Sequence, residues 1–274
     1  MNEQYMIGEY NIKEVQANLL LILIEIDRIC RKHNIKYTIE GGTLLGAIKY
    51  KGFVPWDDDI DIVMLREHYE KFISVCRTEL DYKYFLQNNK NVREYTLSYS
   101  KLCMNNTLYV QSDSQQLNIH HGLFVDIFPI DNIKPKTFKA QLSILRALNG
   151  ALAYKVYKTY NNTTLTSNHV IKNLSCRILS YFPSDWLIYL SNYCMTFYNN
   201  KKTTYVFEVC TGKQKMEPLK RSVYEELVEV EFMGKNVLAT KYYDEFIRSR
   251  FGDIKELPPI DKRVPSHNII KCKL

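Results

Sequence analysis

The residues best suited to chemistry in this sequence are the acids near the end of the stretch Ile39–Met64. Four of five consecutive positions there are aspartates: Asp57, Asp58, Asp59 and Asp61. Their carboxylates repel one another unless a cation or solvent separates them. Asp59 and Asp61 are two residues apart, with one isoleucine between them and another after them. If this segment is a strand, both carboxylates point to one face and both isoleucines to the other.

A strand face that carries two carboxylates is suited to a hard cation such as Mg²⁺, with Mn²⁺ as a substitute. The alternatives are a solvated acidic turn and an aspartate-rich helix cap. A calcium loop of the helix-loop-helix type is disfavoured, because its glycine and closing glutamate are not at the required offsets. The glycine pair upstream and the apolar flanks favour the metal site.

A glycine pair, Gly41-Gly42, precedes the acids in the chain. We expect a short strand over Ile35–Ile39 before it and a helix over Thr43–Tyr50 after it, with Thr43 available as the helix cap. A strand, a glycine turn and a helix start together present a nest of backbone N–H groups that suits phosphate. On its own, however, a glycine pair is as well explained by a plain tight turn.

A third candidate carboxylate, Asp126, lies in the apolar segment Leu123–Pro129, which we expect to be a strand. Burying it requires either a hydrogen-bonded arginine or a share in the cation of the acidic cluster, and we favour the cation. Lys101 lies on an otherwise apolar face of a strand predicted over Tyr95–Met104, where it is either an edge lysine or a cation of the site. Three carboxylates from two strands are what two-metal phosphoryl transfer needs.

The elements that position these residues alternate between helices and strands. The first is an amphipathic helix over Asn11–Lys32, with Asn11 and Glu14 as a partial capping box. Further helices are predicted over Arg66–Leu80, Phe138–Tyr157, His169–Tyr181, Pro183–Tyr198 and Tyr242–Arg250. Short strands are predicted over Tyr84–Leu86, Thr204–Cys210 and Val228–Met233, and a polar linker over Asn161–Asn168.

The helical segment from Pro135 to Asn200 mixes lysine and arginine with many tyrosines. This mixture suits a membrane interface, and a helical layer packed on the core explains it equally well. In the whole chain, Lys and Arg exceed Asp and Glu by 37 − 30 = 7, which suits an anionic substrate or a membrane surface. Because the sequence has no RNP-like or zinc-finger pattern and no long basic run, we expect no nucleic-acid partner.

The cysteines and apolar runs indicate the compartment. Seven cysteines are scattered without a Cys-x-x-Cys pair, which favours reduced thiols in a cytosolic protein. Met1–Glu9 lacks an apolar signal core, and the longest apolar run, Leu19–Ile24, is too short to span a bilayer. We therefore expect a cytoplasmic protein, with peripheral contact at the inner face of the membrane if the helical segment is interfacial.

Several sequence motifs of this chain follow one another in an order that is known from one protein family. The most specific are Gly-Gly-Thr-Leu-Leu-Gly-Ala from Gly41 and Gly-Phe-Val-Pro-Trp-Asp-Asp-Asp-Ile-Asp-Ile from Gly52. The others are Lys101-Leu102 with Asn106-Thr107, His121 to Asp131, Phe251 to Pro259, Lys262-Arg263 and His267. These blocks resemble the LicD family of phosphotransferases, in the DNA-polymerase-beta-like nucleotidyltransferase superfamily. Lys49 and Phe251 depart from it, since the family usually has arginine and tyrosine there; Lys49 keeps the charge but not bidentate phosphate binding.

The resemblance implies an α+β fold with a nucleotidyltransferase-like mixed sheet flanked by helices, and an added helical region. It suggests a catalytic core over 1–134, a helical insertion over 135–202 that faces the acceptor or the membrane, and a C-terminal segment over 203–274 that packs back on the core.

The implied reaction moves a phospho-alcohol, typically phosphocholine from CDP-choline, to a hydroxyl of a cell-surface glycan precursor, free or lipid-linked, with release of CMP. CDP-glycerol and CDP-ribitol are alternative donors. A nucleotidyltransferase that releases pyrophosphate and a non-catalytic scaffold with a metal-stabilised loop are the rival functions.

The resemblance also suggests a role for each site residue. The side chains expected to hold the metal and to act in catalysis are Asp59, Asp61 and Asp126. The residues expected to contact the phosphates of the donor are Gly41, Gly42, Thr43, Lys49 and Lys101. Asp126 is in addition the expected acceptor of the proton from the attacking hydroxyl.

The remaining candidates have more than one expected role. Asp57 and Asp58 would bind a second metal, shape the loop or meet a cationic head group. Trp56 would offer its ring to that head group or act as a packed wall of the turn. Arg263 and His267 would close over the site, although His267 is equally well explained as a surface side chain.

Overall fold

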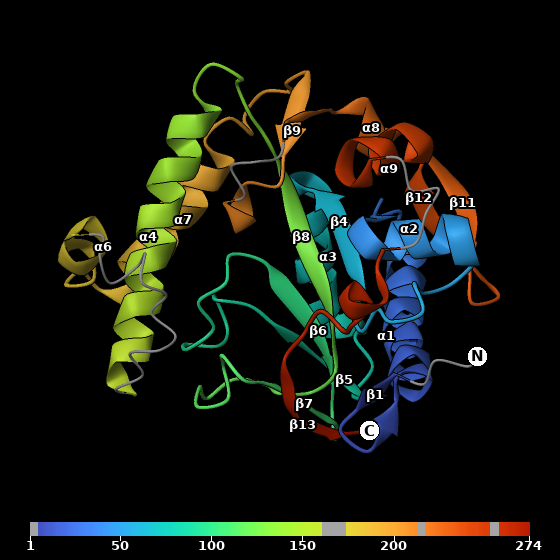
Figure 1. The fold of residues 1–274 in the computed structure, drawn as a ribbon. Coiled ribbons are helices and arrows are strands. Elements are labelled where there is room, and N and C mark those ends of the chain that lie inside the picture. Colours follow the sequence, from blue (N-terminus) through green and yellow to red (C-terminus); the bar gives the residue numbers. More distant parts are fainter. Residues whose placement is uncertain (1–4, 161–173, 213–216, 253–257) are drawn as a thin grey trace.

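The computed structural model describes residues 5–160, 174–212, 217–252 and 258–274, and a long central strand, β8, organises it (Figure 1). Within these residues, seven strands form one mixed sheet: β3 (Thr38–Ile39), β4 (Asp61–Leu65), β5 (Tyr84–Gln87), β6 (Ser100–Met104), β8 (Phe124–Asn132), β9 (Tyr205–Phe207) and β10 (Leu219–Lys220). β4 runs parallel to β8, whereas β6 and β9 pair with β8 antiparallel. The expected α+β class with a mixed sheet is confirmed.

Smaller strand pairs and helices surround this sheet. The antiparallel pairs are β1 (Met6–Ile7) with β2 (Tyr10–Asn11), β7 (Leu108–Gln111) with β13 (Ile269–Lys273), and β11 (Leu227–Phe232) with β12 (Lys235–Thr240). The α-helices are α1 (Ile12–Lys32), α2 (Gly41–Tyr50), α3 (Arg66–Glu79), α4 (Phe138–Thr159), α6 (Leu174–Leu179), α7 (Ser184–Thr196), α8 (Ser222–Glu225) and α9 (Tyr243–Phe251). Short 3-10 turns cover Val209–Thr211 and Ile260–Lys262.

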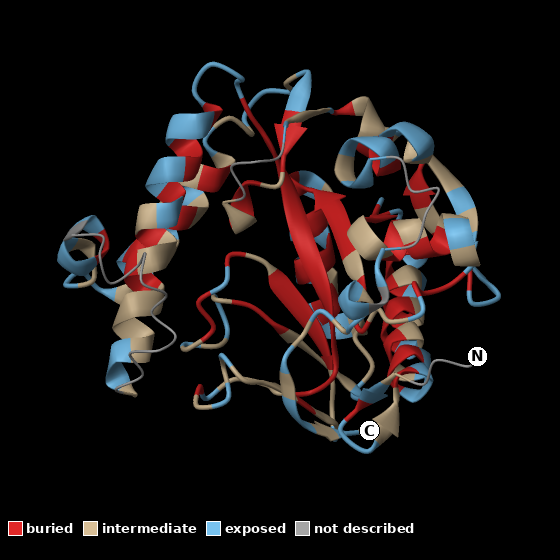
Figure 2. Cartoon of the chain, viewed as in Figure 1, coloured by how far each residue is buried: buried red, intermediate tan, exposed pale blue. Residues whose placement is uncertain are grey.

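The first helix forms as its sequence predicts. The amide of Lys13 donates to Oδ1 of Asn11 at 2.9 Å and the amide of Asn11 donates to Oε2 of Glu14 at 2.9 Å, which completes the expected capping box. One apolar stripe of the helix is fully buried: Val15, Leu19, Ile22, Ile26 and Ile29. This stripe packs with β8, which is buried along its whole length (Figure 2).

Three predicted boundaries near the site are wrong. β4 begins at Asp61, so Asp59 lies in the loop before the strand rather than on the strand face. β6 begins at Ser100, because the chain before it leaves the sheet, and Leu97 is 38% exposed instead of sharing a buried face with Lys101. β3 is limited to Thr38–Ile39, the two residues that pair with β4.

The helical segment forms a layer of its own at the side of the sheet, with α4, α6 and α7 at the left of Figure 1. α4 and α7 share a small apolar core of Leu148, Ala151, Leu152 and Leu187. The polar linker predicted over Asn161–Asn168, and residues 169–173 of the helix predicted after it, lie outside the described residues. The division at 134 and 202 stays a prediction.

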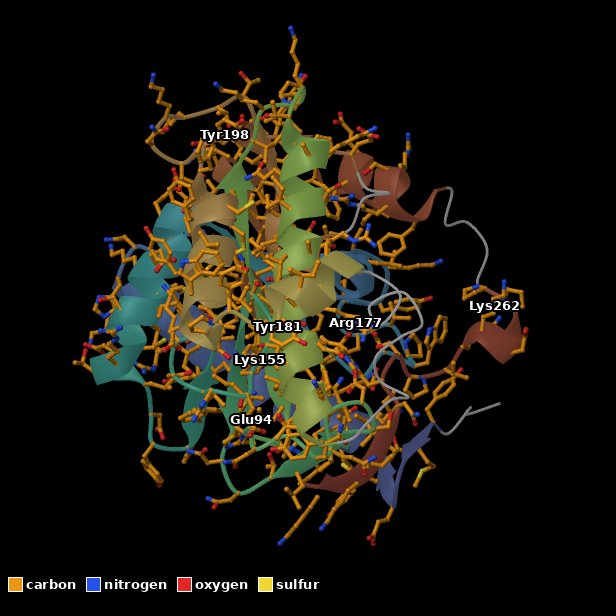
Figure 3. All side chains as sticks on the ribbon, turned by 90° about the vertical axis from the view of Figure 1, so that its left-hand side faces the viewer. Glu94, Lys155, Arg177, Tyr181, Tyr198 and Lys262 are labelled. Atoms are coloured by element: carbon orange, nitrogen blue, oxygen red, sulfur yellow. The ribbon has the colours of Figure 1, made fainter. Side chains whose placement is uncertain are left out.

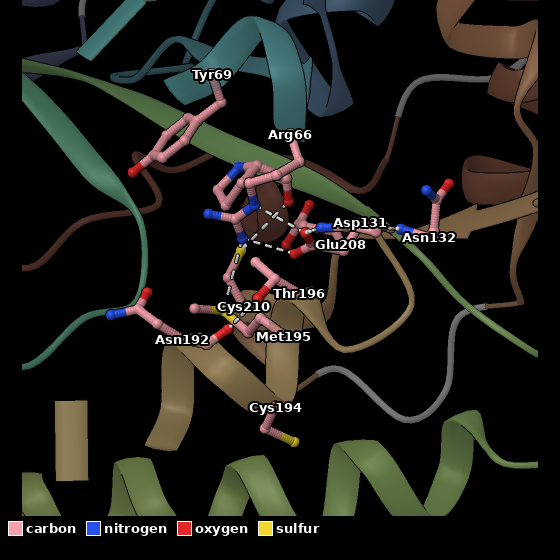
Figure 4. Close-up of polar contacts among 12 residues, drawn as sticks. Arg66, Tyr69, Asp131, Asn132, Asn192, Cys194, Met195, Thr196, Glu208 and Cys210 are labelled. Atoms are coloured by element: carbon pink, nitrogen blue, oxygen red, sulfur yellow. Dashed lines mark hydrogen bonds and ion pairs between the residues drawn. The ribbon is translucent and has the colours of Figure 1, made fainter. Parts of the chain in front are cut away.

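A buried ion pair ties this layer to the core (Figure 4). Arg66, at the start of α3, donates from Nε and Nη2 to the two carboxylate oxygens of Asp131 at 2.7 Å each, and Asp131 is fully buried near the end of β8. Nδ2 of Asn199, which follows α7, donates to Asp131 Oδ1 at 2.6 Å. The end of β8 therefore holds the helical layer, while its beginning serves the site described next.

Candidate active site

The glycine pair lies directly against the acidic cluster. Gly41 has a φ of +59°, a left-handed conformation that favours glycine, where the chain turns from β3 into α2. A methyl group added at Gly41 would lie 3.3 Å from Oδ2 of Asp61, and one added at Gly42 would lie 2.5 Å from Oδ2 of Asp57. The absence of side chains at Gly41 and Gly42 is therefore what lets these two carboxylates approach the start of α2.

Thr43 couples this turn to β4, but it is not the helix cap that we predicted. The helix begins at Gly41, because the carbonyl of Glu40 already accepts the amide of Leu44 at 3.2 Å. The hydroxyl of Thr43 is buried inside the helix and accepts the amide of Asp61 at 3.0 Å. Thr43 thus sets the position of Asp61 relative to the glycine pair.

Asp57 and Asp59 form a carboxyl–carboxylate pair. Burial, together with the charges of Asp59 and Asp58, raises the pKa of Asp57 to about 9, and the two side chains share a hydrogen bond. Gln16 of α1 holds the turn in place, since its Nε2 donates to the carbonyl of Asp57 at 2.9 Å. The Asp57 carboxyl group is therefore a much weaker acid than an exposed aspartate.

The start of β8 brings Asp126 beside Asp61. The two are direct neighbours in the parallel register of β4 and β8, and Asp126 also lies opposite Lys101 in the antiparallel register with β6. Nζ of Lys101 lies 3.2 Å from Oδ1 of Asp126 and 3.3 Å from the centre of the Phe124 ring, and both charged side chains are buried. The partner of Asp126 on the protein is thus a buried lysine and not the arginine that we considered, and its share in a bound cation stays a prediction.

The environment of Asp126 changes its acidity. Burial raises the pKa of Asp126, Lys101 acts in the opposite direction, and the charge of Asp59 adds to the increase. A carboxylate with a raised pKa is a stronger base than an exposed one. Asp126 is therefore suited to accepting a proton.

Asp58 points away from the glycine pair and fastens the C-terminal segment. The hydroxyl of Tyr109 donates to Oδ2 at 2.8 Å, and the amide and the hydroxyl of Ser266 each donate to Oδ1 at 2.8 Å. Nδ1 of His267 lies 3.4 Å from Oδ1, and the Asp58 side chain is fully buried. Of the roles that we considered for Asp58, these contacts match the shaping of the loop.

The charges of Asp58 and His267 stabilise each other. Burial tends to raise the pKa of Asp58, but hydrogen bonds from His267, Ser266 and Tyr109 outweigh it and leave that pKa lowered. For His267, burial acts to lower the pKa, and the bond to Asp58 with the charge of Asp59 outweighs it and raises the pKa. His267 is thus half-buried at the site and not a free surface side chain.

The other predicted residues lie at the rim. Trp56 is next to the acids, and the Arg263 guanidinium lies over its ring at 5.8 Å from the centre, so this ring faces a cation of the protein itself. Lys49 is exposed in the last turn of α2, at the end remote from Gly41 and Gly42. Its expected phosphate contact stays a prediction. Asp253 and Ile254 of the C-terminal block lie outside the described residues.

A pocket of about 270 Å³ opens beside the glycine pair. It is lined by Glu40, Gly41, Gly42, Asp61, Val63, Phe128, Glu208, Phe246, Arg250 and Phe251. Nη2 of Arg250 lies 3.9 Å from Oε1 of Glu40, and the guanidinium lies over the Phe246 ring. Glu40, Glu208 and Arg250 are not marked as site residues by any local sequence pattern, because only the fold brings them together.

The donor groups at the centre suit a hard cation. Within the described part of the chain, no three His, Cys, Asp or Glu side chains are gathered as a preformed metal site. Nevertheless, the Asp57 and Asp59 side chains share a hydrogen bond, Asp61 and Asp126 are neighbours in the register of β4 and β8, and carboxylate oxygens are the ligands that Mg²⁺ prefers. The residues present therefore fit Mg²⁺.

Comparison with known proteins identifies a matching family and several relatives. Residues 34–148 match the family described as "LicD/FKTN/FKRP, nucleotidyltransferase domain". The chain is 25% identical over 264 residues to the lipopolysaccharide cholinephosphotransferase LicD of Haemophilus influenzae, an alignment that covers 93% of this chain and 96% of that protein. Two shorter matches are with uncharacterized proteins. The protein of Rickettsia typhi is 35% identical over a stretch that covers 31% of this chain and 28% of that protein. The protein of Rickettsia prowazekii is 40% identical over a stretch that covers 22% of this chain and 23% of that protein.

The family match contains the parts of the site described above: the glycine pair, the acidic cluster, Lys101 and Asp126. The alignment with the Haemophilus protein extends over nearly the whole chain, beyond the family match on both sides. Residues 34–148 therefore contain a LicD-family nucleotidyltransferase domain, and the chain around it is similar to the Haemophilus protein along nearly its whole length.

Proposed function

We propose that this protein transfers phosphocholine from CDP-choline to a hydroxyl of a cell-surface glycan precursor and releases CMP. The observation that carries the choice of donor is the pocket beside Gly41 and Gly42. A trimethylammonium group has no hydrogen to donate, so proteins bind it with aromatic rings and nearby negative charge. A polyol phosphate would instead need several hydrogen-bonding partners for its hydroxyls.

The pocket has both features that such a cation requires. Three phenylalanines line it, namely Phe128, Phe246 and Phe251, and three carboxylates come from Glu40, Asp61 and Glu208. One arginine, Arg250, is close enough to Glu40 to offset part of that charge. Because Gly41, Gly42 and Asp61 belong both to this pocket and to the acidic centre, a head group in the pocket would place its phosphate at the centre.

The start of α2 and the acids next to it would hold the diphosphate. The backbone N–H groups at the glycine pair are suited to phosphate oxygens, and Lys101 is a buried cation beside Asp126. Asp59 and Asp61, with Asp126, are the side chains that would hold Mg²⁺, whose chemistry when bound is to neutralise charge on the diphosphate and on the leaving CMP. Positioning and charge neutralisation are the main requirements of phosphoryl transfer.

Asp126 would act as the base in this scheme. The acceptor oxygen forms a bond to the phosphorus of the phosphocholine group while the bond from that phosphorus to the CMP oxygen breaks. The proton of the acceptor hydroxyl passes to the Asp126 carboxylate. Lys101 orients the Asp126 carboxylate through their 3.2 Å ion pair.

The test measures ligand-induced thermal stabilisation with Mg²⁺ and one of CDP-choline, CDP-glycerol, CDP-ribitol, CTP or ATP. A ligand at a hundredfold over its Kd stabilises the fold by about 2.7 kcal/mol, which a melting curve resolves. We expect stabilisation by CDP-choline that needs Mg²⁺ and is lost in Asp61→Ala. In Glu208→Gln the effect of CDP-choline should fall, while Glu245→Gln, an exposed glutamate on α9, should bind as wild type.

The other outcomes decide between the rivals. Stabilisation by CDP-glycerol or CDP-ribitol alone would replace phosphocholine with a polyol phosphate. Stabilisation by CTP or ATP, with pyrophosphate and not CMP as the product, would establish a nucleotidyltransferase. If none of the five ligands binds and Asp61→Ala changes only the melting temperature, the scaffold interpretation stands.

A further inference from the structure

The excess of basic over acidic residues in this protein lies in the segment that forms the helical layer. Residues 134–202 contain ten lysines and arginines and one acidic residue, Asp185, whereas the rest of the chain contains 27 basic and 29 acidic residues. The net positive charge of the chain therefore comes entirely from this segment. Among the described residues, the basic side chains of the layer that are exposed include Lys134, Lys139, Lys158 and Arg177.

One face of α7 and its C-terminal extension is a stripe of exposed aromatic side chains. Trp186, Tyr189, Tyr193 and Phe197 follow one another at intervals of three and four residues, and their exposed fractions are 41%, 64%, 54% and 52%. This spacing places them on one side of the helix. The opposite side carries Leu187, Ser191 and Met195, which are buried, so α7 packs on the protein mainly through that side.

The neighbouring elements continue this aromatic surface. Tyr181 is 86% exposed, and the Phe182 ring stacks on Trp186 with ring centres 4.5 Å apart. Between α4 and α7 lies an apolar groove of about 400 Å³, lined by Ala140, Ile144, Leu148, Leu190, Tyr193 and Phe197. Ile144 and Ile178, from α4 and α6, are also more than half exposed. Exposed apolar surface of this extent indicates an interaction site.

Cations border the aromatic surface on the same face of the molecule. Figure 3 views this face directly and labels Lys155 on α4 and Arg177 on α6. It also labels Tyr181, between α6 and α7, and Tyr198, which follows α7. Nζ of Lys155 donates to the carbonyl of Phe182 at 2.7 Å, which fixes the connection between α6 and α7 against α4. Nζ of Lys134 lies 5.1 Å from the centre of the Tyr198 ring.

We propose that this face, formed by α4, α6 and α7, binds the surface of an anionic phospholipid bilayer. Tyrosine and tryptophan prefer the layer between head groups and acyl chains, because one part of each ring system is apolar and another forms hydrogen bonds. Lysine and arginine beside them are attracted to anionic head groups. A second copy of the chain fits this face less well, because the basic charges would repel their equivalents.

The binding is peripheral. Among the described residues, no helix has the length and apolar character needed to cross a bilayer. The aromatic stripe and the groove would enter the head-group region from one side, with α7 parallel to the membrane plane. This inference does not depend on the proposed reaction, since none of its residues lines the pocket at the glycine pair.

The first experiment is co-sedimentation of the full chain with vesicles of phosphatidylcholine, with and without phosphatidylglycerol, at low and high salt. We expect binding that needs the anionic lipid and weakens with salt. Lys139→Glu with Lys158→Glu should reduce the affinity at least tenfold, because each charge near the surface contributes about fivefold. Lys83→Glu with Lys235→Glu makes the same charge change at exposed sites outside the helical layer and should bind as wild type.

The second experiment locates the contact. The chain has two tryptophans, Trp56 and Trp186, so quenching by brominated lipid that is present in wild type and lost in Trp186→Phe places α7 at the bilayer. Tyr189→Ser with Tyr193→Ser should weaken vesicle binding, while Tyr82→Ser, at an 84% exposed tyrosine elsewhere, should not. Equal binding by both charge variants, or a concentration-dependent dimer that the tyrosine variant abolishes, would overturn the proposal.

Discussion

Replacing Asp58 by asparagine tests whether this acid shapes the loop. The acids that lie against the glycine pair, Asp57 and Asp61, are left unchanged. Asp58 is surrounded by hydrogen-bond donors from β7 and from the segment before β13. Asparagine has nearly the same shape, but it has one acceptor oxygen in place of two and no charge. We therefore expect Asp58→Asn to destabilise the attachment of the C-terminal segment without creating a cavity.

The size of the effect follows from the three hydrogen bonds of 2.8 Å that Asp58 accepts, one from Tyr109 and two from Ser266. A bond to a charged group contributes about 1.5–3 kcal/mol and a neutral one about 0.5–1.5 kcal/mol. Loss of the charge therefore lowers the free energy of unfolding by about 3 kcal/mol. For a chain of this size we expect the melting temperature to fall by roughly 6–12 °C.

The destabilisation depends on pH in a direction that the two pKa shifts define. The pKa of Asp58 is lowered in the folded state, so its contribution is complete above the unfolded value of about 3.9 and is lost as the pH falls. The pKa of His267 is raised, so its contribution is complete below the unfolded value of about 6.5 and is lost as the pH rises. The difference between wild type and Asp58→Asn should be largest between about pH 4 and pH 6.5.

The assay is urea unfolding of wild type and Asp58→Asn at about pH 5.5 and about pH 8.5, with and without Mg²⁺. Asp113→Asn is the control, because Asp113 is an exposed acid and should change stability by no more than about 0.5 kcal/mol. Equal stability of Asp58→Asn and wild type at about pH 5.5, combined with loss of stabilisation by Mg²⁺, would show that Asp58 is a metal ligand and that the anchoring role is wrong.

Three further changes test other parts of the structure. Arg66→Met leaves the Asp131 carboxylate buried without its ion-pair partner and should lower the free energy of unfolding in urea by about 3–5 kcal/mol. A smaller loss in the double variant Arg66→Met with Asp131→Leu would support this reason. An equal loss would contradict it. Gly42→Ala would bring a methyl group to 2.5 Å from Oδ2 of Asp57. We expect the folded variant to lose the proposed turnover of CDP-choline. Normal turnover would refute the close approach. Asp57→Asn should raise the melting temperature at neutral pH without divalent cations, because folding no longer has to protonate a carboxyl group whose pKa is about 9. A lower melting temperature would contradict the raised pKa of Asp57.

The local signals in the sequence predicted much of the fold. Asn11 and Glu14 cap α1 as their spacing indicates, and the apolar periodicity defines α1, α3 and α4 to within a few residues. The strand boundaries were less predictable, because pairing partners far along the chain decide where a strand begins. β4 starts at Asp61, the residue whose amide is held by Thr43 and whose neighbour is Asp126, and not at Asp59.

The amino-acid sequence by itself determined which chemical groups are available: a glycine pair, a run of acids, and Asp126 in a strand whose apolar residues ensure its burial. These follow from residue type and short-range spacing, which do not depend on the rest of the fold. Only the tertiary structure decided how the acids divide their roles, because Ser266 and Tyr109 reach Asp58 through the pairing of β13 with β7. It also decided that Asp126 pairs with Lys101, and that Glu40, Glu208 and Arg250 share one pocket, since these contacts join residues far apart in the chain.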